Sequence, residues 1–366
     1  MPVKHRVGFR ILIGYRILII FMEKGESHMS VTAKELAQIL HLSEAAVSVA
    51  LNGKPGVSTA TRRKVMDTAR ELGYDFSRLE EKKTQAQPPR GTLYFIIYRK
   101  HGAVVADTPF FSHLSQGIDV GCKRHHYYLN VSYLDEGEDP ERQLRELIHF
   151  DCKGILLLGT EMLENDLIPF LKLQLPLVIL DTCFETTEAD YVLINNAQGA
   201  YLATCHLISQ CREQPGYLRS SYPINNFSRR ADGFYRAVRS NGMSTANSKV
   251  HYLSPSPEGA HADMKALLEA GETPARCYFA DNDLIALGAM KALKEKGYRI
   301  PQDVALAGFD NMPASAYTEP PLTTVNVPKE YMGEMAVRRL SQLIEDKGST
   351  PVKLEVSTTL IKRKTV

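Results

Sequence analysis

The sequence lacks most of the features that mark disulfide-rich and membrane proteins. Its 366 residues contain no tryptophan and only six cysteines, with no C-x-x-C pair. Scattered cysteines are more typical of a cytoplasmic protein with reduced thiols than of a disulfide framework. The mostly apolar run Ile11 to Phe21 is too short for a membrane-spanning helix, which needs about 20 residues. We therefore expect a cytoplasmic protein without membrane association, and with six free thiols: Cys122, Cys152, Cys183, Cys205, Cys211 and Cys277.

The chain also lacks the short motifs of common enzymes. It contains no G-x-G-x-x-G, G-x-x-x-x-G-K, G-x-S-x-G or H-E-x-x-H sequence. The pair His125-His126 has no carboxylate or thiol cluster at ligand spacing, so an ordinary surface pair is favoured over a metal site. We expect no enzyme activity, no cofactor and no bound metal.

The first 28 residues stand apart from the rest. Lys4, Arg6 and Arg10 followed by an apolar run resemble a signal peptide, but Arg16 interrupts the run and no cleavage site follows. Residues 23–26, Glu-Lys-Gly-Glu, can be encoded by a purine-rich ribosome-binding sequence just upstream of the Met29 codon. We therefore expect translation to start at Met29, which makes residues 1–28 a non-native or disordered extension. Detection of peptides from residues 2–28 by mass spectrometry of the native product would contradict this.

Residues 29–76 have the pattern of three short helices joined by tight turns. Thr32, Ser43 and Ser58 stand at helix N-cap positions, and Thr32 with Glu35 has capping-box spacing. Two helices joined by a tight turn can place the second in the major groove of DNA. The alternative is that these helices only cover the larger domain or mediate protein contacts. The apolar positions expected to pack together are Leu36, Ala37, Leu40, Val47, Ala50, Leu51, Val65, Ala69 and Leu72.

The distribution of charge supports DNA binding only modestly. The whole chain carries a formal net charge of +2, which by itself indicates no nucleic-acid partner. Between Met29 and Arg90, ten Lys and Arg residues exceed seven Asp and Glu residues by three. Such an excess contributes sequence-independent, salt-sensitive affinity for phosphates.

From Gly91 onward, apolar strand-like runs alternate with helical patterns. This alternation predicts a mostly parallel, doubly wound α/β fold. The expected strands are Leu93–Tyr98, Tyr128–Tyr133, Gly154–Leu158, Leu177–Asp181, Tyr191–Ile194, Arg276–Ala280 and Val304–Phe309.

Two parts of the chain resemble the LacI/GalR family of transcription regulators. Residues Val31 to Tyr74 (VTAKELAQILHLSEAAVSVALNGKPGVSTATRRKVMDTARELGY) resemble its DNA-binding headpiece. Ala280–Met290 (ADNDLIALGAM), Val304–Asn311 (VALAGFDN) and Pro320–Val325 (PPLTTV) resemble its periplasmic-binding-protein-like sensor. The resemblance implies a small all-α helix-turn-helix headpiece and an α/β, doubly wound (type I) sensor with two lobes around a cleft. It further implies a homodimeric repressor that binds a palindromic operator and a small-molecule effector, with carbohydrates ahead of purines or nucleosides.

The resemblance also sets the expected domain boundaries. After the extension 1–28, the headpiece spans 29–76, a hinge or linker spans 77–90, and the effector-binding domain spans 91–366. By analogy, the first lobe contains about 91–213 and 328–348, and the second contains about 214–327 and 349–366.

In the headpiece, the resemblance assigns two kinds of DNA contact. Glu44, Ala45 and Val49 take the base-reading positions. The family often has arginine where Val49 stands, so a contact with a thymine methyl replaces a guanine contact. The charged run Leu79 to Lys83 replaces the usual hinge helix, whose leucine wedges into the minor groove. The residues expected to contact or position phosphates are Thr32, Ser43, Ser48, Asn52, Ser58 and Thr61.

In the sensor, six residues are expected to contact the effector. They are Phe110, Phe111, Asn195, Arg230, Asn282 and Asp310, on the positions that match the family's ligand cleft. An aromatic ring can stack on a sugar or base, and a guanidinium fork suits vicinal hydroxyls or carboxylates. Each has a structural alternative: core packing for one phenylalanine, a solvated helix surface for Arg230, and turn capping for Asn282 and Asp310. Asn195 stands where the family usually has aspartate.

Two other classes of protein remain as rivals. An extracytoplasmic sugar-binding protein of a transport system has a similar sensor fold, but such proteins carry no headpiece. An enzyme on an α/β scaffold is the second rival, and no constellation of residues supports it.

Overall fold

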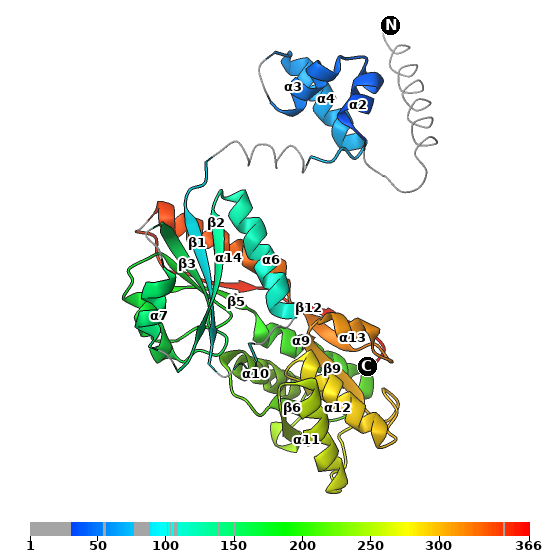
Figure 1. The fold of residues 1–366 in the computed structure, drawn as a ribbon. Helices are drawn as coiled ribbons and strands as arrows, with labels where there is room; N and C mark the ends of the chain where they lie inside the picture. Colours follow the sequence, from blue (N-terminus) through cyan, green and yellow to red (C-terminus); the bar gives the residue numbers. More distant parts are fainter. Residues whose placement is uncertain are drawn as a thin grey trace, which may run out of the picture. The chain divides into compact units, whose positions relative to one another are not determined.

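The computed structural model describes residues 31–53, 56–76, 88–100, 102, 104–105, 109–137, 139–148, 151–346 and 348–366. The chain divides into two compact units, residues 1–88 and 89–366 (Figure 1). The predicted extension 1–28 and most of the predicted hinge, including Leu79 to Lys83, lie outside the described residues. Within the described ranges, no helix has the length and apolar character needed to cross a membrane. All six cysteines are free, as predicted.

The smaller unit contains three helices, α2 (Ala33–Leu40), α3 (Glu44–Leu51) and α4 (Thr59–Glu71). Each begins at a predicted hydroxyl cap, because an exposed helix start needs acceptors for its first N–H groups. The Thr32 hydroxyl accepts from the Glu35 amide at 3.3 Å, and the Glu35 carboxylate accepts from the Thr32 amide at 2.6 Å. All nine predicted apolar positions pack into one cluster, with Leu72 only partly buried.

The first lobe of the larger unit is built on a six-stranded sheet with the order β11-β5-β4-β3-β1-β2. Every pairing in it is parallel. The strands are β1 (Thr92–Arg99), β2 (Tyr128–Asp135), β3 (Cys152–Leu158), β4 (Leu177–Leu180), β5 (Asp190–Ile194) and β11 (Lys353–Val356).

Both faces of this sheet are buried. Along β1, Leu93, Phe95 and Ile97 pack into one cluster while Tyr94 and Ile96 pack into another. This alternation places successive side chains on opposite faces, as a strand covered on both sides requires. Helices α6 (Pro109–Arg124) and α14 (Lys329–Glu345) lie side by side on one face (Figure 1). The helices packed on the other face are α7 (Pro140–Leu147), η1 (Glu164–Leu167) and α8 (Ile168–Leu171).

The second lobe repeats this plan with the strand order β12-β10-β9-β8-β6-β7. Its strands are β6 (Gly216–Ser220), β7 (Val250–Leu253), β8 (Cys277–Ala280), β9 (Ala305–Asp310), β10 (Thr323–Asn326) and β12 (Thr359–Ile361), of which β12 runs antiparallel to β10. Its helices are α9 (Asn196–Cys211), α10 (Asn225–Ser240), η2 (Thr245–Asn247), α11 (Pro257–Glu269), α12 (Asp283–Glu295) and α13 (Pro313–Tyr317).

Two of the predicted lobe boundaries are wrong. Helix α9 packs on β8, β9 and β10, so residues 196–211 belong to the second lobe rather than the first. Its buried Ala200, Ala203 and Leu207 need an apolar sheet beneath them, and the second sheet supplies it. Strand β11 pairs with β5, so residues 353–356 belong to the first lobe rather than the second. The pairing satisfies main-chain groups of β5 that would otherwise lie on a sheet edge.

Candidate functional site

A cavity of about 460 Å³ lies between the two lobes, at the carboxyl ends of their parallel strands. This is the position where ligands bind in doubly wound sheets. Five of the six predicted effector residues line the cavity, namely Phe110, Phe111, Arg230, Asn282 and Asp310. The other lining residues were not predicted; they are Val104, Thr160, Asp181, Ile224, Asn226, Phe227, Leu284 and Met312.

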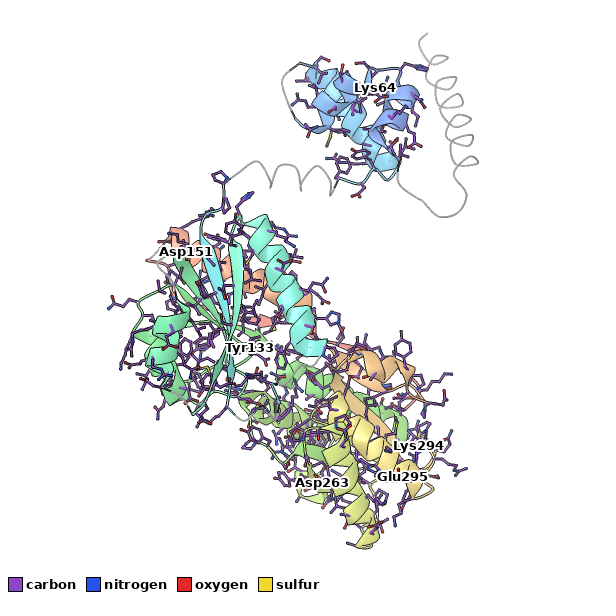
Figure 2. The ribbon with its side chains drawn as sticks, in the orientation of Figure 1. Lys64, Tyr133, Asp151, Asp263, Lys294 and Glu295 are labelled. Atoms are coloured by element: carbon purple, nitrogen blue, oxygen red, sulfur yellow. The ribbon has the colours of Figure 1, made fainter. Side chains whose placement is uncertain are left out.

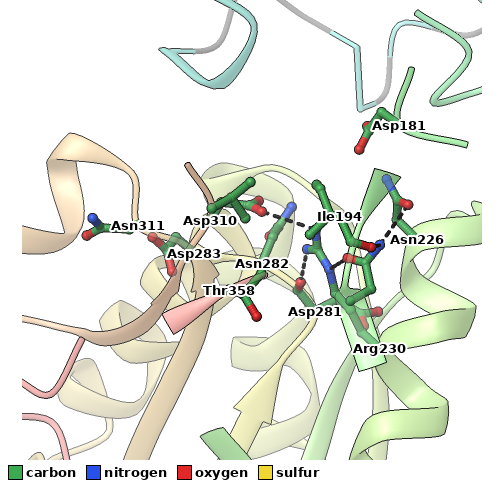
Figure 3. A network of polar contacts seen from close by, with 12 residues as sticks. Asp181, Ile194, Asn226, Arg230, Asp281, Asn282, Asp283, Asp310, Asn311 and Thr358 are labelled. Carbon is green, nitrogen blue, oxygen red and sulfur yellow. Dashed lines mark hydrogen bonds and ion pairs between the residues drawn. The ribbon is translucent and has the colours of Figure 1, made fainter. Parts of the chain in front are cut away.

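Arg230 on α10 organises the polar side of this cavity (Figure 3). Its Nε donates to Asn196 Oδ1 at 2.9 Å, its Nη2 donates to Asp310 Oδ1 at 3.1 Å, and its Nη1 donates to the Asp281 carbonyl. The guanidinium also lies 3.8 Å from the ring centre of Phe309. Only 3% of Arg230 is exposed, so the alternative of a solvated helix arginine is wrong. Three of its five N–H donors hold the pocket together, which leaves two for a ligand.

Asp310 ends strand β9 in a strained backbone conformation. Its φ of 101° is uncommon for a residue with a side chain, and such strain tends to occur at functional sites. The Arg230 guanidinium binds its carboxylate, while the buried Lys329 ammonium donates to its main-chain carbonyl. Arg230 thus fixes the Asp310 side chain at the cavity wall, and Lys329 fixes its main chain.

Asp181 is the most informative residue that the sequence analysis missed. It follows β4, has a φ of 65° and is 3% exposed. The Thr160 hydroxyl donates to Oδ2 at 2.6 Å, whereas the buried Oδ1 has no hydrogen-bond partner within 3.5 Å, and the nearby Asn226 amide lowers the pKa of the carboxyl. An unpaired buried carboxylate oxygen at a cavity wall is available to accept from a ligand hydroxyl. An acidic residue at the end of a predicted buried strand was the available signal, as for Asp310.

The charge of Asp181 is costly in the unliganded protein. Burial raises the pKa of its carboxyl to about 6, against the opposing effects of the Thr160 hydroxyl and the Arg230 charge. The carboxyl of an unfolded chain titrates near pH 4. Above pH 6 the folded protein therefore buries a charge that the unfolded chain exposes to water. This contribution opposes folding above pH 6 and fades as the pH falls toward 4.

We expect Asp181→Asn to stabilise the protein at pH 8, by an amount on the order of 3 kcal/mol for a shift of about two pKa units. The asparagine oxygen can still accept from Thr160 while the buried charge disappears. Urea unfolding at pH 8 and pH 5 measures this, and the gain should shrink to roughly half at pH 5. Asp232→Asn, on the exposed face of α10, is the control and should show no pH-dependent gain. An equal gain for Asp181→Asn at both pH values would contradict the assignment.

The apolar side of the cavity is aromatic. Phe110 and Phe111 begin α6, are 7% and 9% exposed, and lie edge to face with ring centres 5.1 Å apart. Both rings belong to an apolar cluster that spans the two lobes and both also line the cavity, so core packing does not keep either ring from facing a ligand. Phe227 faces them from the second lobe among the cavity-lining residues.

Asn195 does not line the cavity. Its side chain accepts from the Gln198 amide at 3.1 Å and caps α9, one residue before Asn196, which binds Arg230. Asn282 lines the cavity and also caps α12 through the Ile285 amide at 2.9 Å. The structure thus combines the capping and pocket interpretations at Asn282, and places Asn195 only in the capping role.

The second helix of the headpiece presents the predicted DNA-contacting face. Val47, Ala50 and Leu51 are buried, whereas Glu44 and Ala45 are exposed and Val49 is half-buried. Alternation of this kind leaves one face of α3 against the core and the other open to a groove of DNA. Ser48 is exposed on that face, and its carbonyl accepts from the Asn52 amide group at 2.8 Å.

The remaining phosphate candidates gather at helix starts. Ser43 accepts from the Ala46 amide at 3.2 Å, and Ser58 accepts from the Thr61 amide at 3.0 Å. Thr32 caps α2 in the same way. Helix N-termini attract anions through their N–H groups and dipole, so these hydroxyls stand where phosphates bind well. Lys64 lies exposed on α4 of the same unit (Figure 2).

Comparison with known proteins matches both units. A family model described as a periplasmic binding protein-like domain matches residues 205–366. The ribose operon repressor of Haemophilus influenzae is 30% identical over 343 residues, which cover 92% of this chain and 98% of the relative. The HTH-type transcriptional repressor PurR of Mannheimia succiniciproducens is 29% identical over the same shares of both chains. A solved complex of the transcriptional regulator CelR with cellobiose has a TM-score of 0.67 and 26% identity, covering 92% of this chain and all of that one.

A three-helix headpiece and a two-lobed sensor, with a cavity between the lobes lined by aromatic and polar residues, define a DNA-binding transcription repressor controlled by a small molecule. These two relatives are repressors, and each aligns with this chain over nearly its whole length, headpiece included. This excludes the transport and enzyme alternatives. The chain belongs to the LacI/GalR family, as its sequence predicted. In the described part of the chain, no group of three His, Cys, Asp or Glu side chains could hold a metal ion.

Proposed function

We propose that the chain is a homodimeric repressor that binds a two-fold symmetric operator and is controlled by a small neutral carbohydrate in the cavity between its lobes. The observation that carries the effector assignment is the pairing of aromatic rings with Asp181, Arg230 and Asp310 around one cavity between the lobes. As an operator-binding protein it acts in the cytoplasm.

The chemistry of the cavity favours a neutral polyhydroxylated ligand. The unpaired oxygen of Asp181 accepts a hydroxyl, and the two remaining donors of Arg230 suit vicinal hydroxyls. Phe110 or Phe111 can cover the apolar face of a sugar ring. An anionic ligand is disfavoured because Asp181 and Asp310 are both acidic, and Asp310 already binds the guanidinium.

Effector control follows from the position of this cavity. Its walls come from both lobes, so a ligand binds best to one relative arrangement of the lobes. Only such differential affinity can shift the DNA-binding state, and the coupling must be reciprocal. We therefore propose that operator DNA changes the affinity for the effector by the same factor.

The dimer places two headpieces on adjacent half-sites. The DNA-contacting residues we propose are those of the headpiece face described above: Glu44, Ala45 and Val49 for bases, with Thr32, Ser43, Ser48, Asn52, Ser58 and Thr61 for phosphates. Two-fold symmetry of the protein then matches the two-fold symmetry of the operator.

An edge strand supports pairing between two copies of the sensor. Strand β2 lies at the edge of the first sheet and carries Val131, which is 45% exposed. It also carries Tyr133, which is 46% exposed (Figure 2). Tyr128 on the same strand is 64% exposed. An edge with apolar side chains pairs readily with another chain, and we propose that the second copy covers it.

We expect Val131→Asp to shift the protein from dimer toward monomer, because a buried interface would have to desolvate the new charge. Sedimentation velocity at micromolar protein concentration measures the monomer–dimer equilibrium. We expect the dissociation constant of the dimer to rise at least tenfold. Ile168→Asp, at an equally exposed apolar position (48%) on α8, is the control and should leave assembly unchanged. Retention of the dimer by Val131→Asp would exclude this strand from the interface.

Selection of random and genomic DNA fragments by the purified protein tests the whole proposal. Enrichment of a palindrome with two half-sites is the expected result, whereas enrichment of a single half-site would contradict the dimer. A thermal-shift panel then compares carbohydrates with purines and nucleosides. A shift by purines alone would replace the carbohydrate proposal.

A further inference from the structure

Four main-chain N–H groups between β1 and α6 converge on one carboxylate. Lys100 and Gly102 donate to Oε2 of Glu161 at 2.9 and 3.1 Å. Val104 and Val105 donate to Oε1 of the same side chain at 2.7 and 2.9 Å. Each carboxylate oxygen thus accepts from at least two amides, and the four donor residues lie in bends rather than in a helix or strand.

The burial of Glu161 makes this arrangement specific. The residue is 4% exposed, and a buried carboxylate is unfavourable unless it is well hydrogen-bonded. Hydrogen bonds to an ionised acceptor are roughly twice as strong as neutral ones. In turn, the segment needs the carboxylate, because irregular backbone has no ladder to satisfy its N–H groups. The carboxylate and the segment therefore stabilise each other.

The same segment forms part of the effector cavity. Val104 lines the cavity, and Val105 is 3% exposed in the apolar cluster that contains Phe110 and Phe111. Thr160, immediately before Glu161, donates to Asp181 at 2.6 Å. The neighbouring residues Thr160 and Glu161 thus hold two different parts of the cavity wall: Thr160 binds Asp181, and Glu161 binds the backbone at Val104.

We propose that Glu161 is a positioning residue of the effector site, whose carboxylate fixes the backbone around Val104 and thereby the apolar wall that the effector meets. The inference rests on the proposed effector cavity and extends it to a residue outside the cavity lining. Because Glu161 already accepts from these four N–H groups, they are not available to an anionic ligand. At this part of the wall, Val104 therefore offers an apolar side chain to the ligand.

Glu161→Gln tests the positioning directly. Its amide group retains one acceptor oxygen and turns an NH₂ donor toward the other pair of N–H groups. We expect one pair of amides, Lys100 with Gly102 or Val104 with Val105, to exchange hydrogen at least tenfold faster in the full chain. Glu164→Gln is the matched control, because Glu164 accepts from the hydroxyls of Thr186 and Thr187 and not from this segment. Unchanged exchange at all four amides in Glu161→Gln would overturn the proposal.

Glu161→Ala adds a rescue experiment. Removal of the carboxylate leaves four N–H groups around a space that acetate can occupy. We therefore expect acetate at about 100 mM to restore slow hydrogen exchange of these four amides. Chloride at the same ionic strength is the control and should restore less. Equal effects of acetate and chloride would contradict a carboxylate-specific role.

Ligand binding supplies a readout that separates the two proposals. D-ribose and cellobiose serve as probes, measured by calorimetry with the wild type, Glu161→Gln and Glu164→Gln. We expect the affinity for a probe that binds the wild type to fall about tenfold in Glu161→Gln and less than twofold in Glu164→Gln. Equal affinities in all three proteins would overturn the positioning role. Binding of neither sugar to the wild type would count against the carbohydrate proposal, while amide exchange alone would still decide the role of Glu161.

Discussion

Replacement of Arg230 with alanine is expected to abolish effector binding and to lower the free energy of unfolding by about 3–5 kcal/mol. The change removes the donor to Asp310 Oδ1, Asn196 Oδ1 and the Asp281 carbonyl together. The partly buried carboxylate of Asp310 would then lack its compensating charge. Breaking a buried ion pair by removal of one partner is strongly destabilising for this reason.

Urea unfolding measures the loss of stability in Arg230→Ala. Calorimetric titration with a sugar that binds the wild type measures the loss of effector binding. Arg239→Ala is the matched control, because Arg239 lies exposed near the end of the same helix. It should change the stability by less than about 0.5 kcal/mol. Arg230→Lys should keep the charge but lose the planar fork, so it should recover stability better than binding. Wild-type affinity in Arg230→Ala would remove Arg230 from the site.

Val49→Arg is expected to change which operator the protein selects. An arginine at this position of α3 can bind O6 and N7 of guanine, whereas valine offers only apolar contact with a thymine methyl. A bidentate contact of this kind discriminates by about 1–3 kcal/mol, which corresponds to a preference of roughly 5- to 150-fold. The selected half-site should therefore change at one base pair from thymine to guanine, with the remaining positions preserved.

Selection from random DNA at one stated salt concentration measures this change. Gln38→Arg is the control, since residue 38 is exposed on α2 and the variant adds the same charge outside the proposed reading face. It should strengthen binding to all sequences alike through phosphate attraction. The same half-site for wild type and Val49→Arg would show that residue 49 does not read a base.

The headpiece was predictable because its signals are local. Thr32, Ser43 and Ser58 cap helices within three residues of themselves, and the apolar stripe repeats within two turns. The seven predicted strands were also found, because buried parallel strands are continuous apolar runs, and the half-exposed edge strand β2 is also rich in β-branched and aromatic residues. Strands such as β6 (GYLRS) and β7 (VHYL) were missed, since each is short and mixes polar with apolar residues.

The sequence by itself determined the class of protein, the three-helix headpiece, the two doubly wound sheets and five of the residues around the cavity. Only the tertiary structure decided that α9 lies in the second lobe and β11 in the first, that Arg230 is buried, that Asp181 lines the cavity, and that Glu161 binds the backbone next to Val104. The first group depends on residues a few positions apart, which a linear pattern records. The second depends on contacts such as Arg230 with Asp310 or Glu161 with Val104, whose partners lie 57 to 80 residues apart. Such pairs meet only when the sheets assemble, so no local pattern can reveal them.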